Sequence, residues 1–134
     1  MRISVIAVGR VRPPYQDDVE HYRKMLTGRV KVDLVEVRDD AQVRRRIPDR
    51  SLVVLLATDG EALHSEGLSG WLEERRRDGR DVCFVIGGPK GLELEADMRL
   101  SLGPMTLPHQ LARVVLLEQI FRAHKILAGE PYHY

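Results

Sequence analysis

Three short apolar runs rich in β-branched residues constrain the fold of this chain more than any other feature. They cover residues 2–8, 51–57 and 82–86, and a glycine follows each within three positions. A strand that is apolar on both faces is typical of a parallel sheet that is covered on both sides. We therefore expect these runs to be buried strands of such a sheet.

Helix and strand patterns fill the intervals between the runs. Apolar residues recur at helical spacing in residues 15–27 and again from Ser65 onward. Residues 30–37 alternate strictly between apolar and polar, which predicts a strand with one wetter face. A short basic helix follows, and either Asp39 or Asp40 is expected to cap it. Because strands alternate with helices, the sequence predicts an α/β fold with a mostly parallel sheet flanked by helices.

Three loops are expected at the carboxyl edge of this sheet, where open α/β sheets bind their ligands. Residues 86–91 are glycine-rich, but their spacing fits neither a dinucleotide fingerprint nor a P-loop, and a plain strand-to-helix turn is the alternative. Residues 102–107 carry no charge, so a ligand there would meet main chain and apolar walls. Such walls suit a neutral purine and a thioether better than a triphosphate. The alternative is that residues 102–107 form a structural loop without a ligand. Residues 57–60 form the third loop.

The segment from Pro108 to about Ala128 is too apolar for an ordinary surface helix. Its apolar residues point in most directions around the helix axis, rather than along one stripe. Such a helix needs cover from more than one side, and one sheet covers only one of them. The sequence therefore predicts a homodimer.

A few polar side chains in the last quarter of the chain are candidates for proton transfer and charge stabilisation. His109 is the first of them and starts the long helix, where the helix dipole disfavours an imidazolium. Helix capping is an alternative role for this residue. For Tyr132 and His133, the alternative is that they belong to a frayed chain end. The candidate catalytic residues are His109, Arg113, Arg122, Tyr132 and His133.

Composition narrows the remaining choices. The 134 residues are enough for one domain with its own core, so we expect a single domain over residues 1–134. No apolar run approaches the roughly 18 residues of a membrane span, and no His/Cys spacing suggests a metal site. The single cysteine, Cys83, is expected in the core and fits a reducing cytoplasm.

The formal net charge of +1 does not by itself indicate a nucleic-acid binder. Two local basic clusters, residues 44–46 with Arg50 and residues 75–77 with Arg80, have the charge to meet a phosphate backbone. Cationic residues that simply complement the ends of solvated helices are the alternative for both clusters.

Several motifs in a fixed order resemble the RlmH family, the SPOUT-class methyltransferases that modify a pseudouridine of large-subunit ribosomal RNA. The resemblance covers essentially the whole chain and is densest toward its end. The motifs that carry it are residues 6–9, 78–81, 86–92, 105–114, 118–123 and 129–133.

This resemblance implies an α/β fold with a C-terminal trefoil knot, a homodimer, and an S-adenosyl-L-methionine pocket formed by the knot. It also implies methylation of N3 of a pseudouridine in 23S ribosomal RNA within the assembled ribosome. The cofactor contacts it implies are Leu56, Gly87, Leu102, Gly103, Pro104, Met105, Thr106 and Leu107.

The sequence departs from the family pattern in three places. The segment between Val37 and Ser51 is shorter, Gly103-Pro104 replaces a small-polar pair, and Tyr134 stands where a basic residue is common. Two other functions remain open at this stage. One is a non-catalytic ribosome- or nucleotide-binding module with the same fold, and the other is a flavodoxin-like protein that holds a phosphate-bearing cofactor at residues 87–91.

Overall fold

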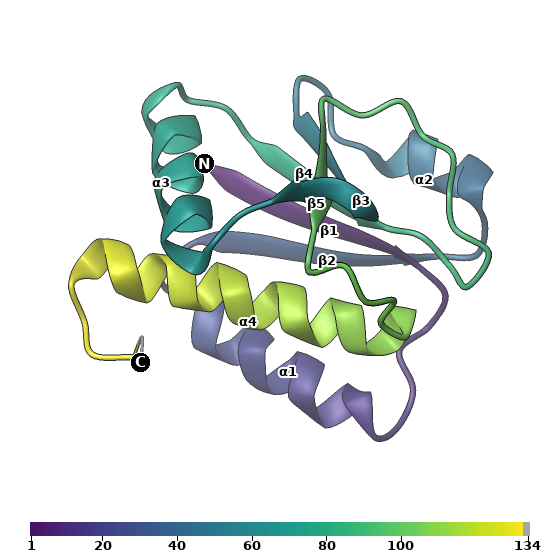
Figure 1. The fold of residues 1–134 in the computed structure, drawn as a ribbon, viewed down its shortest axis with the longest axis horizontal. Coiled ribbons are helices and arrows are strands. Elements are labelled where there is room, and N and C mark those ends of the chain that lie inside the picture. The colour runs from purple at the N-terminus through teal and green to yellow at the C-terminus, as the bar shows by residue number, and fades with distance from the viewer. Residues whose placement is uncertain (133–134) are drawn as a thin grey trace.

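The computed structural model describes residues 1–132, which form a five-stranded parallel sheet with the order β2-β1-β4-β3-β5. The predicted α/β fold is confirmed (Figure 1). The knotted path of the C-terminal part stays a prediction. The strands are β1 Arg2–Val8, β2 Lys31–Val37, β3 Leu52–Ala62, β4 Val82–Ile86 and β5 Met98–Ser101, and the helices are α1 Tyr15–Leu26, α2 Asp40–Arg46, α3 Ser65–Arg77 and α4 His109–Ala128.

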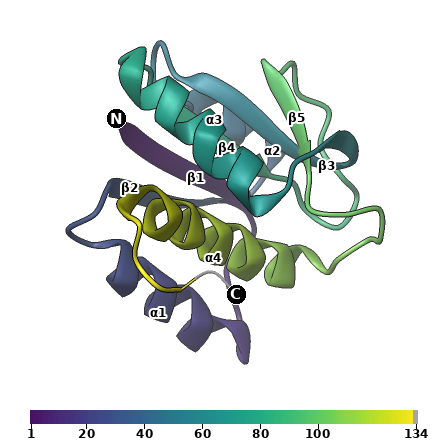
Figure 2. The same ribbon diagram turned by 60° about the vertical axis from the view of Figure 1, so that its left-hand side comes forward.

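The two faces of the sheet are covered unequally. Helices α1, α3 and α4 pack on one face, where alternate residues of β1 and β4, such as Ile3, Val5 and Phe84, form the larger core (Figures 1 and 2). The other face is covered by α2 and by residues 92–96, through Val43 and alternate residues of that segment. Because α2 has only seven residues, it cannot cover the face alone.

Helix α2 is fixed at both of its ends. Asp39 is its N-cap, since its Oδ1 accepts a hydrogen bond from Gln42 N at 2.9 Å. At the other end, Arg44 donates to Glu93 O at 3.0 Å. The helix is therefore tied to the segment beside which it packs.

Strand β3 is longer than the sequence predicted, because it continues through residues 58–60 to Ala62. It pairs with β5 in two stretches, with a register shift between Leu56 and Glu61. A Cβ at Gly60 would lie 2.7 Å from the carbonyl carbon of Arg99, so only glycine fits this close approach. Gly60, which predicted the end of the strand, instead allows the backbone of β3 to lie close to that of β5.

Helix α4 packs against α1, α3 and the sheet, and these elements bury Leu116, Leu117 and Ile120 completely. The single chain therefore covers more of α4 than the sequence predicted. Leu111, Val115 and Ile126 stay half-buried, whereas Leu127 is 42% exposed. Among residues 1–132, the helices are all too short or too polar to cross a membrane.

Candidate active site

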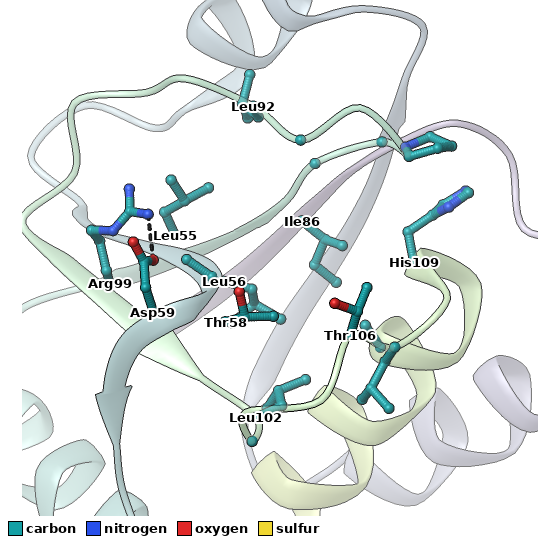
Figure 3. A pocket seen from close by; sticks show the side chains of 18 of the residues that line it. Leu55, Leu56, Thr58, Asp59, Ile86, Leu92, Arg99, Leu102, Thr106 and His109 are labelled. Atoms are coloured by element: carbon teal, nitrogen blue, oxygen red, sulfur yellow. Dashed lines mark hydrogen bonds and ion pairs between the residues drawn. The ribbon is translucent and has the colours of Figure 1, made fainter.

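A pocket of about 500 Å³ opens at the carboxyl edge of the sheet, between the second half of β3 and the loops that follow β4 and β5 (Figure 3). All three segments that the sequence placed at this edge contribute to its lining, but residues 57–60 belong to β3 and the prediction of a loop there was wrong. The start of α4 and Leu92 complete the walls. The parallel sheet brings these loops together, because every strand ends at the same edge.

The walls of the pocket are mostly apolar. Leu55, Leu56 and Ile86 reach into it from the strands. The charged pair at its margin is Arg99 and Asp59, whose side chains lie 2.7 Å apart. The hydrogen bond from Arg99 lowers the pKa of Asp59 below its ordinary value, so the carboxylate stays ionised and the two charges neutralise each other.

Seven of the eight residues predicted to contact a cofactor line this pocket. They are Leu56, Gly87, Leu102, Gly103, Met105, Thr106 and Leu107, and Pro104 lies outside the lining. Sequence reasoning missed Ser101, which shapes the loop that carries most of them. Its Oγ accepts a hydrogen bond from Gly103 N at 3.0 Å and lies 3.2 Å from Thr58 O. Gly103 has a φ of +139°, which favours glycine at this turn.

The turn after β4 folds back on itself at Gly87. A Cβ at this position would lie 2.8 Å from the Cβ of Leu92, which also lines the pocket. The glycine therefore allows Leu92 to close over the strand end, and a side chain would push it away.

We expect Gly87→Ala to raise the dissociation constant of a ligand in this pocket roughly tenfold, since a forced shift of Leu92 would cost on the order of 1.4 kcal/mol. Calorimetric titration with S-adenosylmethionine, the ligand that the resemblance implies, measures this constant. Gly70→Ala is the matched control, because a Cβ there meets nothing within 4 Å. Equal affinities for the unchanged chain and Gly87→Ala would contradict the steric argument.

His109 lines the pocket at the first residue of α4. Burial, followed by the nearby charges of Arg113 and Arg12, lowers the pKa of His109 below its ordinary value. The lowered pKa agrees with the sequence prediction of a disfavoured imidazolium, although its causes are burial and the charges of the two arginines. The imidazole is therefore neutral at pH 7 and able to accept a proton.

Arg113 lies one turn further along α4 and is only 4% exposed. It donates to Glu36 Oε2 at 2.8 Å and to Gly9 O at 3.1 Å. Its charge is thus directed at β2 and at the end of β1, and it does not line the pocket. Glu36 was missed by sequence reasoning, because nothing in the alternating pattern of β2 marks it.

Arg122 and Tyr132 form a separate group near the far end of α4. Arg122 follows Arg113 by nine residues, which places it roughly 13 Å further along the helix. Its Nε donates to Glu118 at 3.0 Å, and its guanidinium lies 4.9 Å from the centre of the Tyr132 ring. Within one chain, these two residues are not brought to His109. His133 lies outside the described residues.

The turn after α4 is held by Glu130. Its carboxylate accepts from Arg29 at 2.8 Å and from Lys125 at 2.5 Å. These two hydrogen bonds, that of Arg29 first, lower the pKa of Glu130 to about 2. The residues that lead to Tyr132 are therefore anchored both to the turn after α1 and to α4.

We expect this anchor to weaken in acid. The folded-state pKa of Glu130 is depressed from about 4.5 to about 2, so its contribution to stability is complete above pH 4.5 and is lost as the pH falls toward 2. The difference in free energy of unfolding between the unchanged chain and Glu130→Gln should shrink over this window. Glu95→Gln, an exposed carboxylate, is the control, and a difference that does not depend on pH would contradict the assignment.

The remaining polar features are less suited to catalysis. In the basic cluster of α3, Arg75 pairs with Asp78, and Arg76 and Arg77 pair with Glu73. Cys83 is fully buried, as predicted, and burial raises its pKa to about 12. Among residues 1–132, no three His, Cys, Asp or Glu side chains gather as metal ligands would.

A parallel α/β sheet with a largely uncharged pocket at its carboxyl edge defines a class of small-molecule-binding α/β proteins. Comparison with known families is more specific. The model of the family described as "Predicted SPOUT methyltransferase" matches residues 1–133, and the chain belongs to this family.

Three curated relatives carry the name ribosomal RNA large subunit methyltransferase H. The chain is 39% identical to the protein of Acetivibrio thermocellus, 40% to that of Bifidobacterium animalis subsp. lactis and 36% to that of Clostridium botulinum. Each alignment covers 99% of this chain and 99% of the relative, over 158 positions. Because this chain has 134 residues, the relatives contain residues that it lacks.

Proposed function

We propose that this chain, acting as one domain over residues 1–134, is an S-adenosylmethionine-dependent methyltransferase of large-subunit ribosomal RNA. We further propose that it methylates N3 of a pseudouridine within the assembled ribosome, in the cytoplasm. Its family membership supports methyl transfer, and the shared name of its relatives supports the ribosomal RNA substrate. The observation that carries the proposal is the largely apolar pocket, with one neutralised ion pair in its lining, that His109 borders.

The residues of the pocket fit the cofactor that SPOUT methyltransferases in general use. Its volume lies within the range of small-molecule sites. Leu102, Thr106 and Leu107 would offer main-chain groups and apolar contacts, which suit a purine and a thioether. The neutralised Arg99 leaves little attraction for a triphosphate or a flavin phosphate. When bound, S-adenosylmethionine supplies a methyl group that its sulfonium has already activated.

His109 is our candidate for the group that accepts the proton from N3 of the target base. Its Nε2 lies 4.0 Å from the position that a Cβ of Gly9 would take, so the ring borders both the pocket and the end of β1. Arg113 supports this corner by holding Glu36 and the Gly9 carbonyl. Neutral imidazole at pH 7 is the protonation state that the role requires.

Arg122, Tyr132 and His133 are proposed to act on the pocket of a second copy of the chain. The partly exposed apolar residues of α4, Leu127 among them, support a homodimer in which one tail completes the other site. Sedimentation equilibrium tests the dimer. Mixing a tail-truncated chain with a His109→Ala chain tests sharing, because one intact site can form only if the two chains complement each other.

Methyl transfer to ribosomes that lack the modification tests the function itself. We expect the purified protein to label intact ribosomes and to label naked ribosomal RNA poorly, because a chain of this size has little surface for reading free RNA. Binding of ribosomes without any transfer of methyl groups would instead support the non-catalytic module.

A further inference from the structure

The first part of the loop between β1 and α1, residues 9–12, is fixed by side chains from other elements. Gln110 holds it at two points, because its Nε2 donates to Arg10 O and its Oε1 accepts from Arg12 N, both at 2.9 Å. Glu36 Oε2 accepts from Val11 N at 2.6 Å. An exposed loop with this many anchors has a defined backbone path.

The same loop lies directly beside the candidate active site. Gly9 N donates to Val37 O at 2.8 Å, and Gly9 O accepts from Arg113 at 3.1 Å. Gly9 has a φ of +97° and faces His109. The loop therefore borders the imidazole that lines the pocket.

The loop carries two arginines with exposed side chains, Arg10 and Arg12. Among residues 1–132, neither guanidinium makes an ion pair or a side-chain hydrogen bond. Arg23 and Arg99, which are also exposed, pair with Glu20 and Asp59. Within the same part of the chain, Arg38, Arg45, Arg46, Arg50 and Arg80 make no ion pair either. What sets Arg10 and Arg12 apart is the place of their loop beside His109. The charge of Arg12 contributes to the lowered pKa of His109, which agrees with the short distance between the loop and the imidazole.

We propose that residues 9–12 bind the phosphodiester backbone of the RNA substrate next to the nucleotide that enters the pocket. Arg10 and Arg12 are the phosphate contacts, and Gln110 is a positioning residue that acts through them. The inference rests on the proposed function and adds the place where the RNA backbone is held. The pocket offers no unpaired cation of its own among its lining residues, whereas a guanidinium matches a phosphate group in shape and charge. A fixed loop also loses little entropy on binding.

The test compares Arg10→Ala/Arg12→Ala with the unchanged protein in methyl transfer to ribosomes and in direct ribosome binding, over a range of salt concentrations. Measurements at pH 8 keep His109 neutral in both. We expect KM for ribosomes to rise on the order of tenfold or more with kcat little changed, and the slope of log KM against log salt concentration to fall by about 1.5. Arg10→Lys/Arg12→Lys should recover most of the salt dependence.

Two controls separate this effect from general loss of charge or of the pocket. Arg76→Ala/Arg77→Ala removes two arginines that both pair with Glu73 and lie on α3, outside the lining of the pocket, and it should leave KM near that of the unchanged protein. Affinity for S-adenosylmethionine should stay the same in Arg10→Ala/Arg12→Ala. Gln110→Ala should raise KM, and adding it to Arg10→Ala/Arg12→Ala should add little, because it acts through the same contacts.

The outcomes distinguish this inference from the proposed function. An active protein whose KM and salt slope survive Arg10→Ala/Arg12→Ala overturns the inference and leaves the function intact. An equal rise in KM for Arg76→Ala/Arg77→Ala also overturns it. A protein that transfers no methyl group, but binds ribosomes with a salt slope that depends on Arg10 and Arg12, overturns the function and supports the inference. Absence of both transfer and binding overturns both.

Discussion

Replacing His109 by alanine is expected to lower kcat for methyl transfer by about 10²–10⁴-fold, the contribution of a positioned general base. The imidazole lines the pocket, and its lowered pKa keeps it neutral at pH 7. In the unchanged protein, kcat should therefore fall only as the pH drops below about 6.5, where the imidazole gains a proton. A profile of kcat against pH between 5 and 9 measures both effects.

The matched control for this variant is His21→Gln, which changes an exposed histidine of α1. It should keep both kcat and the pH profile. If His109→Ala retains kcat within about threefold and the same acidic limb, another group accepts the proton and the assignment is wrong.

Replacing Glu36 by alanine is expected to destabilise the fold by about 3 kcal/mol, near the lower end for a broken buried ion pair. The change leaves Arg113, which is 4% exposed, with only the Gly9 carbonyl as an acceptor. Glu36 itself is 41% exposed, so water can replace part of what is lost. Urea unfolding followed by circular dichroism measures the free energy of unfolding.

Two further variants show whether the buried charge is the cause. Glu36→Ala/Arg113→Met should be less destabilised than Glu36→Ala, because no guanidinium is left buried without its partner. Asp33→Ala, on the same strand, breaks an exposed pair with Arg2 and should cost less than about 1 kcal/mol. A Glu36→Ala chain as stable as Asp33→Ala would contradict the argument.

Local patterns were sufficient for most of the secondary structure. The apolar runs predicted β1 and β4 with their observed bounds, and strict alternation predicted β2 at the edge of the sheet. The predicted end of β3 was wrong. Gly60 is needed where β3 lies close to β5, and only the pairing of the two strands reveals this contact. The sequence also underestimated how much of α4 is buried within one chain. A helical pattern does not show that α1 and α3 pack beside α4 on the same face of the sheet.

The order and period of apolar residues were enough to predict the parallel sheet and the loops after β4 and β5 that meet at its carboxyl edge. Which polar groups surround the site depends instead on how the chain packs in three dimensions. It joined Glu36 of β2 to Arg113 of α4, placed Gly9 beside His109, and set Arg122 apart in the second half of the helix. Such pairs are separated by many residues along the chain, and ion pairs and hydrogen bonds act over a few ångströms in space.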